Sequence, residues 1–127
     1  MSKTVVYSDK APEPIGPYSQ AISAGNMLFV SGQIAINKSS GDIITSNIEA
    51  ETIQVMANLS EILTAAGMDF SNVVKTTIFL KDMSNFPKVN EIYGKYFQRE
   101  PPARETVEVS RLPKDVNVEI SCIAIKG

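Results

Sequence analysis

PPARETVEV at residues 101–109, followed by VNVEI at residues 116–120, predicts two β-strands joined by a turn. β-Branched residues recur in both stretches, and residues 110–115 between them include a proline and an aspartate. If the two strands pair antiparallel, Arg104 at the start of the first and Glu119 within the second face one cavity. A fixed guanidinium beside a carboxylate can hold and hydrolyse a small anion, so this stretch suggests a site as well as a fold.

The chain upstream of residue 101 has the patterns of four more strands. They are expected at residues 3–7, 21–24, 27–33 and 73–80. Gly25-Asn26 lies between the second and third of these and is typical of a tight hairpin, in which glycine supplies a positive φ. Residues 9–17 contain three prolines and a glycine and predict an ordered loop, and residues 37–42 predict a second turn.

Two amphipathic helices are expected between these strands. Ser46-Asn47-Ile48-Glu49 has the spacing of a capping box, and apolar residues follow at helical steps until Gly67 provides a stop. Residues 84–97 carry aromatic and aliphatic side chains along one side and predict the second helix. Pro87 is tolerable there only in the first turn, because it lacks a backbone N–H.

This order of elements predicts a single α+β domain over residues 1–127, a two-layer sandwich with two helices covering one face of a sheet. By alternation, Ile123 and Ile125 lie on the same side as Glu119. Two helices cannot cover both faces of the sheet, so this partly apolar second face predicts a homo-oligomer.

Composition limits the possible partners. The net charge of −2 gives no overall attraction to nucleic acid or anionic lipid. The sequence has no stretch of about 20 apolar residues that would cross a membrane, and its first residues do not resemble a signal peptide. We therefore expect a cytoplasmic protein that binds neither nucleic acid nor membrane.

The chain contains no histidine and one cysteine. Serine-triad and Cys-His hydrolysis are excluded, because histidine is the base in both. Cys122 cannot form an internal disulfide, and no Cys/His cluster has the spacing of a zinc site. The sequence therefore predicts no zinc site, and nothing in it suggests a carboxylate-only magnesium site.

Arg104 and Glu119 are the candidate catalytic residues, and each has an ordinary alternative. Arg104 can grip a substrate carboxylate through two parallel hydrogen bonds, or it can form a structural salt bridge with an acidic residue. Glu119 lies between Val118 and Ile120, where a carboxylate needs a partner or some water. It can act as a general acid or base, or it can simply face solvent.

Four further residues are candidates for substrate binding. Tyr18 follows a stiff bend and can close over a small ligand, and Gly32 after Ser31 lets a ligand or another backbone approach its strand closely. Asn90 in the second helix can hydrogen-bond a ligand. The ordinary alternatives are a loop-packing tyrosine, a β-bulge and a solvated asparagine.

Several separated segments of the chain, taken together, closely resemble the RidA (YjgF) family of reactive intermediate deaminases. They are IGPYSQA (15–21), SGQI (31–34), VKTTI (74–78), NEIY (90–93), PAR (102–104) and RLPKD (111–115). The resemblance implies a chorismate-mutase-like fold with a mixed sheet, and a homotrimer whose sheets line a central barrel with clefts between subunits. It also implies cofactor-free hydrolysis of 2-iminobutanoate, 2-iminopropanoate and their enamine tautomers to 2-keto acids and ammonia.

The resemblance also assigns roles to the candidate residues. Arg104 matches the family's carboxylate-binding arginine and Glu119 its water-activating glutamate, and Tyr18, Ser31, Gly32 and Asn90 match its other pocket positions. Two positions depart from the family pattern. Glu105 replaces a small residue and Ser121 replaces a second glutamate, so Glu105 could pair with Arg104 and block anions if the strand contains a bulge. A non-catalytic module that binds small carboxylates, and a ribonuclease or translation inhibitor, are the alternative functions.

Overall fold

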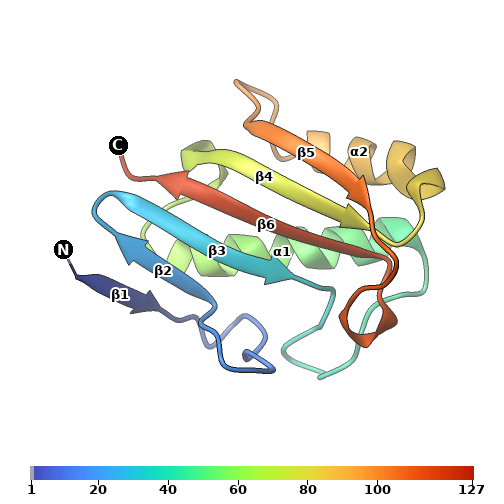
Figure 1. Cartoon of the computed structure of the whole chain (residues 1–127), viewed down its shortest axis with the longest axis horizontal. Coiled ribbons are helices and arrows are strands. Elements are labelled where there is room, and N and C mark those ends of the chain that lie inside the picture. The colour runs from blue at the N-terminus through green and yellow to red at the C-terminus, as the bar shows by residue number, and fades with distance from the viewer. Residues whose placement is uncertain (1) are drawn as a thin grey trace.

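The computed structural model describes residues 2–127, which form one six-stranded sheet and two α-helices. The strands are β1 (Lys3–Val6), β2 (Ala21–Ala24), β3 (Met27–Gln33), β4 (Val73–Leu80), β5 (Ala103–Glu108) and β6 (Val118–Ile125), and the helices are α1 (Ile48–Ala65) and α2 (Phe86–Gly94). Figure 1 shows the strands side by side with α1 and α2 behind them. The predicted α+β class and the order of elements are confirmed.

The sheet is mixed, with the strand order β1-β2-β3-β6-β4-β5. All neighbouring strands are antiparallel except β4 and β5, which are parallel and connected through α2. The expected hairpin between β2 and β3 is present, and Gly25 in its turn has a φ of +61°. A β-strand that returns parallel needs a crossover, and α2 supplies it.

The expected pairing of the last two strands is wrong. β5 pairs with β4, Arg104 lying opposite Thr76, and β6 pairs with the other side of β4, Cys122 lying opposite the same threonine. β4 therefore separates the two strands that the sequence suggested as a hairpin. The apolar, β-branched character of β4 explains this result, because such a strand is stabilised by neighbours on both sides.

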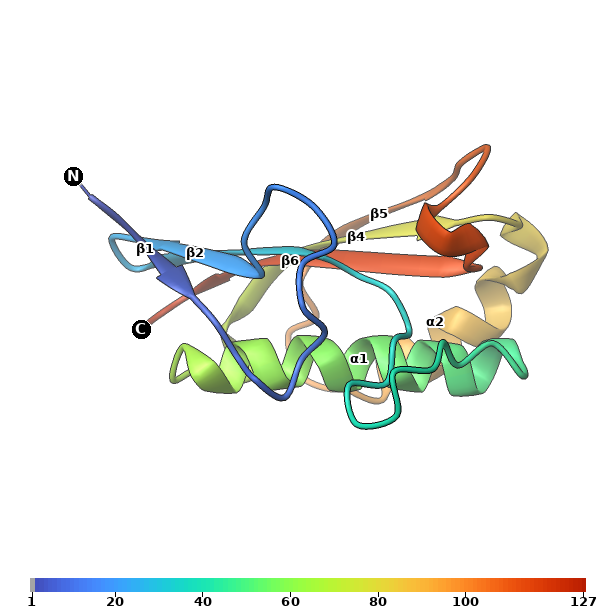
Figure 2. The ribbon, with the colours of Figure 1, turned by 90° about the horizontal axis from the view of Figure 1, so that it is seen from below.

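Both helices cover one face of the sheet, as Figure 2 shows. The core lies between them and the sheet, where Val55, Leu59 and Ile62 of α1 are fully or almost fully buried together with Ile78 and Ile120 from the central strands. Each fully buried aliphatic side chain of this kind stabilises the fold by roughly 1.5–3 kcal/mol. This layer of contacts fixes which face of each strand points toward the helices.

The helix ends differ slightly from the sequence prediction. The cap of α1 is Asn47 rather than Ser46, and its side chain accepts a hydrogen bond from the backbone N–H of Ala50 at 2.7 Å. α2 is shorter than residues 84–97 at both ends, because residues 83–85 form a separate 3₁₀ turn and the helix ends at Gly94. Pro87 lies in the first turn of α2, as expected.

The other face of the sheet is not covered by helices. Phe29 of β3 and Val107 of β5 are exposed there by 42% and 41%. Ile123 is opposite Phe29 in the β3–β6 pairing, which places both on this open face. The second apolar face inferred from the sequence is therefore present in the chain.

Candidate active site

The strand register places the two candidate catalytic residues on opposite faces of the sheet. Arg104 shares its face with Thr76 and Cys122, which point toward the helices, whereas Glu119 is opposite Phe79 and points to the open face. The expectation that Arg104 and Glu119 of one chain face one cavity is wrong. Each has a separate cleft of its own.

Arg104 lies in a cleft between β5 and α2, lined also by Asn90, Tyr93 and Phe97 and by Pro101 and Pro102; we call it the Arg104 cleft. Its Nη1 donates a hydrogen bond to Asn90 Oδ1 at 2.8 Å. Its guanidinium carbon lies 5.0 Å from the ring centre of Tyr93 and 5.4 Å from that of Phe86. These cation–π contacts hold the guanidinium without neutralising it.

No carboxylate among residues 2–127 forms an ion pair with Arg104. Arg104 therefore does not form the structural salt bridge that was its alternative role. Asn90 is likewise not simply a solvated residue, because it orients the guanidinium. A guanidinium has five N–H donors, so the Arg104 cleft retains donors for an external carboxylate.

The aromatic walls of the Arg104 cleft were not identified as site residues from the sequence. Phe86 appeared there only as part of the apolar face of a helix, and Tyr93 only on that face and in the NEIY segment, with no role assigned to it. The Tyr93 hydroxyl is 2.7 Å from Thr76 Oγ1, and burial raises the pKa of Tyr93, so the phenol stays neutral beside the arginine. The sequence indicated these walls only through the helical spacing of the aromatic residues, in a helix that is followed by the strand with Arg104.

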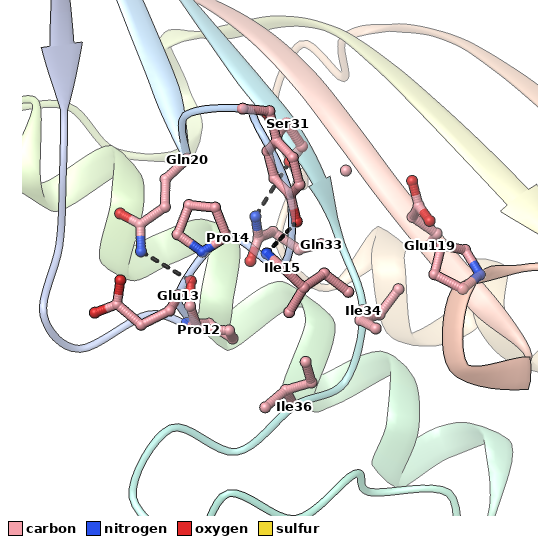
Figure 3. A pocket seen from close by; sticks show the side chains of 13 residues that line it. Pro12, Glu13, Pro14, Ile15, Gln20, Ser31, Gln33, Ile34, Ile36 and Glu119 are labelled. Atoms are coloured by element: carbon pink, nitrogen blue, oxygen red, sulfur yellow. Dashed lines mark hydrogen bonds between the residues drawn. The ribbon is translucent and has the colours of Figure 1, made fainter.

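Glu119 lies in a second cleft of about 360 Å³, the Glu119 pocket, on the open side of the sheet. Figure 3 shows it between the loop that carries Pro14 and Ile15, the segment with Ile34 and Ile36, and Glu119. Tyr18, Ser31 and Gly32 also line it, so the structure brings these predicted residues together with Glu119. Its walls are otherwise largely apolar.

Gly32 leaves the space that Glu119 occupies. A Cβ atom at residue 32 would lie 2.8 Å from Cδ and 3.0 Å from Cγ of Glu119, distances that real Cβ atoms avoid. The β3–β6 pairing also shifts register between Val30 and Gln33, which agrees with the β-bulge named as the ordinary alternative for this glycine. What approaches the glycine in this chain is the glutamate side chain.

The environment of Glu119 suits a base. Its side chain is half-buried, and burial raises its pKa above the ordinary value of a glutamate. A raised pKa makes the carboxylate a stronger proton acceptor. The alternative of a freely solvated strand residue does not fit this pocket.

Gln20, which was not among the predicted site residues, holds the loop that forms one wall of the Glu119 pocket. Its buried side-chain amide bonds the backbone of Ser8 in both directions and donates to the Pro12 carbonyl at 2.9 Å. Tyr18 accepts a hydrogen bond from the Ile15 N–H at 3.2 Å, and Ser31 donates to the Ser19 carbonyl at 2.7 Å. The pocket wall is therefore built from an ordered loop.

The two departures from the family pattern lie outside the Arg104 cleft. Glu105 points to the open face and pairs with Lys75, whose Nζ is 3.0 Å from its Oε1. The β4–β5 register is continuous, so no bulge turns Glu105 toward Arg104. Ser121 lies on the same open face, opposite Thr77.

Cys122 and metal-binding clusters are the other features relevant to catalysis. Burial raises the pKa of Cys122 to about 12, so its thiol is not a nucleophile at neutral pH. In the described part of the chain no group of three or more His, Cys, Asp or Glu residues could hold a metal ion. Neither α1 nor α2 is long and apolar enough to cross a membrane.

Comparison with known proteins identifies the class to which this fold and these clefts belong. Residues 8–126 match the family model described as Endoribonuclease L-PSP. The chain belongs to this family, whose members include proteins named RutC and reactive intermediate deaminase.

Individual relatives are similar over nearly the whole chain. A RutC family protein of Pyrococcus horikoshii is 53% identical, covering 98% of both chains. The mouse 2-iminobutanoate/2-iminopropanoate deaminase is 47% identical, covering 98% of this chain and 93% of its own. The crystal structure of Escherichia coli TdcF with bound serine matches with a TM-score of 0.93 and 35% identity, covering 98% of this chain and 99% of its own.

Proposed function

We propose that this protein is a 2-iminobutanoate/2-iminopropanoate deaminase that hydrolyses reactive imines and their enamine tautomers to 2-keto acids and ammonia. The observation that carries the proposal is the state of Arg104, which is oriented by an amide and two aromatic rings and has no acidic partner in the described chain. Such a guanidinium is suited to a small carboxylate ligand. The name of the mouse relative and the serine bound to TdcF support a substrate of amino-acid size.

The complete site is proposed to form between neighbouring copies of the chain. One chain holds Arg104 and Glu119 on opposite faces of its sheet, so a substrate that touches both needs an Arg104 cleft from one subunit and a Glu119 pocket from another. The exposed Phe29 and Val107 on the open face support burial of that face in an oligomer. We propose a homotrimer with its open faces around a central barrel.

In this mechanism Arg104 binds the substrate carboxylate and fixes the imine carbon near Glu119. The protonated imine carbon is already electrophilic and needs no metal to polarise it. Glu119 accepts a proton from water as the water oxygen bonds to that carbon, giving a carbinolamine. Protonated Glu119 then gives its proton to the amine nitrogen. As the C–N bond breaks, the carbinolamine hydroxyl loses its proton to the Glu119 carboxylate and the C=O bond of the 2-keto acid forms, and ammonia takes this proton and leaves as ammonium.

The other pocket residues have supporting roles in the proposal. Asn90 orients Arg104, Gly32 leaves room for the Glu119 carboxylate, and Tyr18 and Ser31 line the space that the substrate enters. Cys122 is free and buried, which suits a reducing compartment, and we place the reaction in the cytoplasm.

A coupled assay tests the activity. An amino-acid oxidase generates 2-iminopropanoate from alanine, and the loss of imine is followed with and without this protein. Arg104→Ala loses a charge-assisted hydrogen bond worth roughly 1.5–3 kcal/mol, so kcat/KM should fall at least about tenfold per bond lost. Unaccelerated imine loss with the native protein would refute the proposal.

Mixing two inactive variants tests the shared site. Arg104→Ala and Glu119→Gln subunits, unfolded and refolded together at equal amounts, should regain about a quarter of the native activity, because random assembly gives that share of sites one intact residue from each side. No recovery, with mixed oligomers demonstrated by mass spectrometry, would mean that each site belongs to one chain. Size-exclusion chromatography with light scattering gives the number of subunits.

The native protein and the same variants also distinguish two other functions from a deaminase. A regulatory module would be stabilised by pyruvate, lose that effect in Arg104→Ala, and show no turnover. The family model's description names an endoribonuclease, but a net charge of −2 and the absence of histidine do not favour RNA cleavage. RNA cleavage that survives Glu119→Gln and Arg104→Ala would come from another site or from a contaminant.

A further inference from the structure

Glu51 on α1 is a buried carboxylate that the proposed chemistry does not use. It is fully buried, and no lysine or arginine of the described chain pairs with it. Burying a carboxylate without a cation is costly unless several hydrogen bonds compensate for the lost water. The structure therefore has to provide donors.

Three donors converge on the Glu51 carboxylate from a segment 66 residues away. Its Oε2 accepts from the backbone N–H of Asn117 at 2.7 Å and from that of Val118 at 3.3 Å. Its Oε1 accepts from the side-chain amide of Asn117 at 2.8 Å. Glu51 thus ties α1 to the first residues of β6, which run above the helix in Figure 2.

Asn117 and Val118, whose N–H groups bind Glu51, are the two residues before Glu119 in the chain. Val118 is the first residue of β6 and points into the core, and Glu119 follows it and points into the Glu119 pocket. Fixing the backbone at Asn117 and Val118 therefore fixes where the Glu119 side chain leaves the strand. The tolerance is small, because the carboxylate fits into the space above Gly32.

The turn before β6 needs such an anchor. Lys114 and Asp115 have φ values of +54° and +58°, a left-handed conformation that residues with a side chain rarely adopt. Pro113, next to them, lines the Glu119 pocket. Lys81 bonds Asp115 at 2.9 Å on the outside of this turn, and Glu51 holds its other end from the helix side.

We infer that Glu51 is a positioning residue: its buried carboxylate clamps Asn117 and Val118 and so holds Glu119 in register with Gly32 for the reaction. Glu51 touches no substrate and acts only through the start of β6. The negative charge is not required, because glutamine at residue 51 can accept from both backbone N–H groups and donate to Asn117 once that amide rotates. The inference rests on the proposed function. Its consequence, that glutamine can replace Glu51, distinguishes a hydrogen-bonding clamp from an effect of charge.

The test compares Glu51→Ala and Glu51→Gln with Leu63→Ala. Leu63 is fully buried near the other end of α1, so its truncation serves as a control for lost stability without a lost clamp. Glu51→Ala should lower kcat by roughly 10- to 100-fold with KM changed less than about threefold, the cost of misplacing a catalytic group by about 1 Å. Glu51→Gln should retain kcat within about threefold of the native protein, and Leu63→Ala should lose thermal stability but keep kcat.

Hydrogen exchange supplies a readout that does not depend on the activity. The amides of Val118 and Glu119 should exchange faster in Glu51→Ala than in Leu63→Ala. Equal exchange in these two variants, equal kcat in them, or equal loss in Glu51→Ala and Glu51→Gln would overturn the inference. If Glu51→Ala does not fold, Glu51→Asp, whose shorter side chain withdraws the carboxylate, takes its place. A native protein without imine turnover refutes the proposed function instead, and hydrogen exchange still decides whether Glu51 is the clamp.

Discussion

Gly32→Ala is the most specific perturbation of the Glu119 pocket. The added Cβ would lie 2.8 Å from Cδ of Glu119, whereas carbon atoms pack best at about 3.5–4.0 Å, so the carboxylate has to move by about 1 Å. A displacement of this size costs about 10²-fold in rate, or about 2.7 kcal/mol in the activation barrier. Alanine is not intrinsically unfavourable in a strand, so the loss should come from the steric conflict.

The oxidase-coupled assay measures kcat for Gly32→Ala, and calorimetry measures its affinity for pyruvate. We expect kcat to fall about 100-fold, with a much smaller change in pyruvate affinity, because Arg104 holds the carboxylate of the ligand. A double-mutant cycle with Glu119→Gln is the control, because Gly32→Ala should cost little more once the base is gone. Native kcat in Gly32→Ala, or an undiminished loss in the Glu119→Gln background, would refute the reasoning.

Three further predictions follow from the described contacts. Asn90→Ala should weaken pyruvate binding by roughly tenfold in calorimetry, because it removes a hydrogen bond that orients Arg104; unchanged affinity would contradict this. Burial raises the pKa of Glu119, so kcat/KM should fall as the pH drops through that raised pKa, at a higher pH than for an exposed glutamate, and Glu119→Gln should lack this limb. Asn47→Ala should lower the free energy of unfolding by about 1 kcal/mol in urea titrations and leave kcat unchanged, and altered kcat would show that this cap also affects the site.

Much of the secondary structure could be predicted from the sequence. The Gly25-Asn26 hairpin, the strand at residues 73–80 and the first-turn position of Pro87 follow from properties of neighbouring residues: positive φ, side-chain period and a missing N–H. The sequence pattern placed the N-cap of α1 at Ser46 and the structure has it at Asn47, an error of one residue between two adjacent polar residues. The residues themselves made these positions candidates, but their roles were assigned through the resemblance, since Tyr18 or Asn90 alone has an ordinary explanation.

The pairing of β5 was decided by the tertiary structure, and so was the composition of each cleft. Two strands joined by a short turn can pair with each other, but here the α2 crossover brings β5 parallel to one edge of β4, while β6 pairs with the other edge of β4. That choice puts Arg104 and Glu119 on opposite faces and makes the aromatic rings of α2 part of the Arg104 cleft. The contacts of Gly32 with Glu119 and of Glu51 with Asn117 join distant segments, so no local pattern could predict them.

The sequence by itself therefore determined the kinds of elements, their order and the chemical groups available: an arginine, a glutamate and no histidine. Backbone preferences and side-chain periodicity act over a few residues, and the sequence records them directly. The tertiary structure decided which face each group occupies, because strand order and register depend on burial of the whole sheet against two helices.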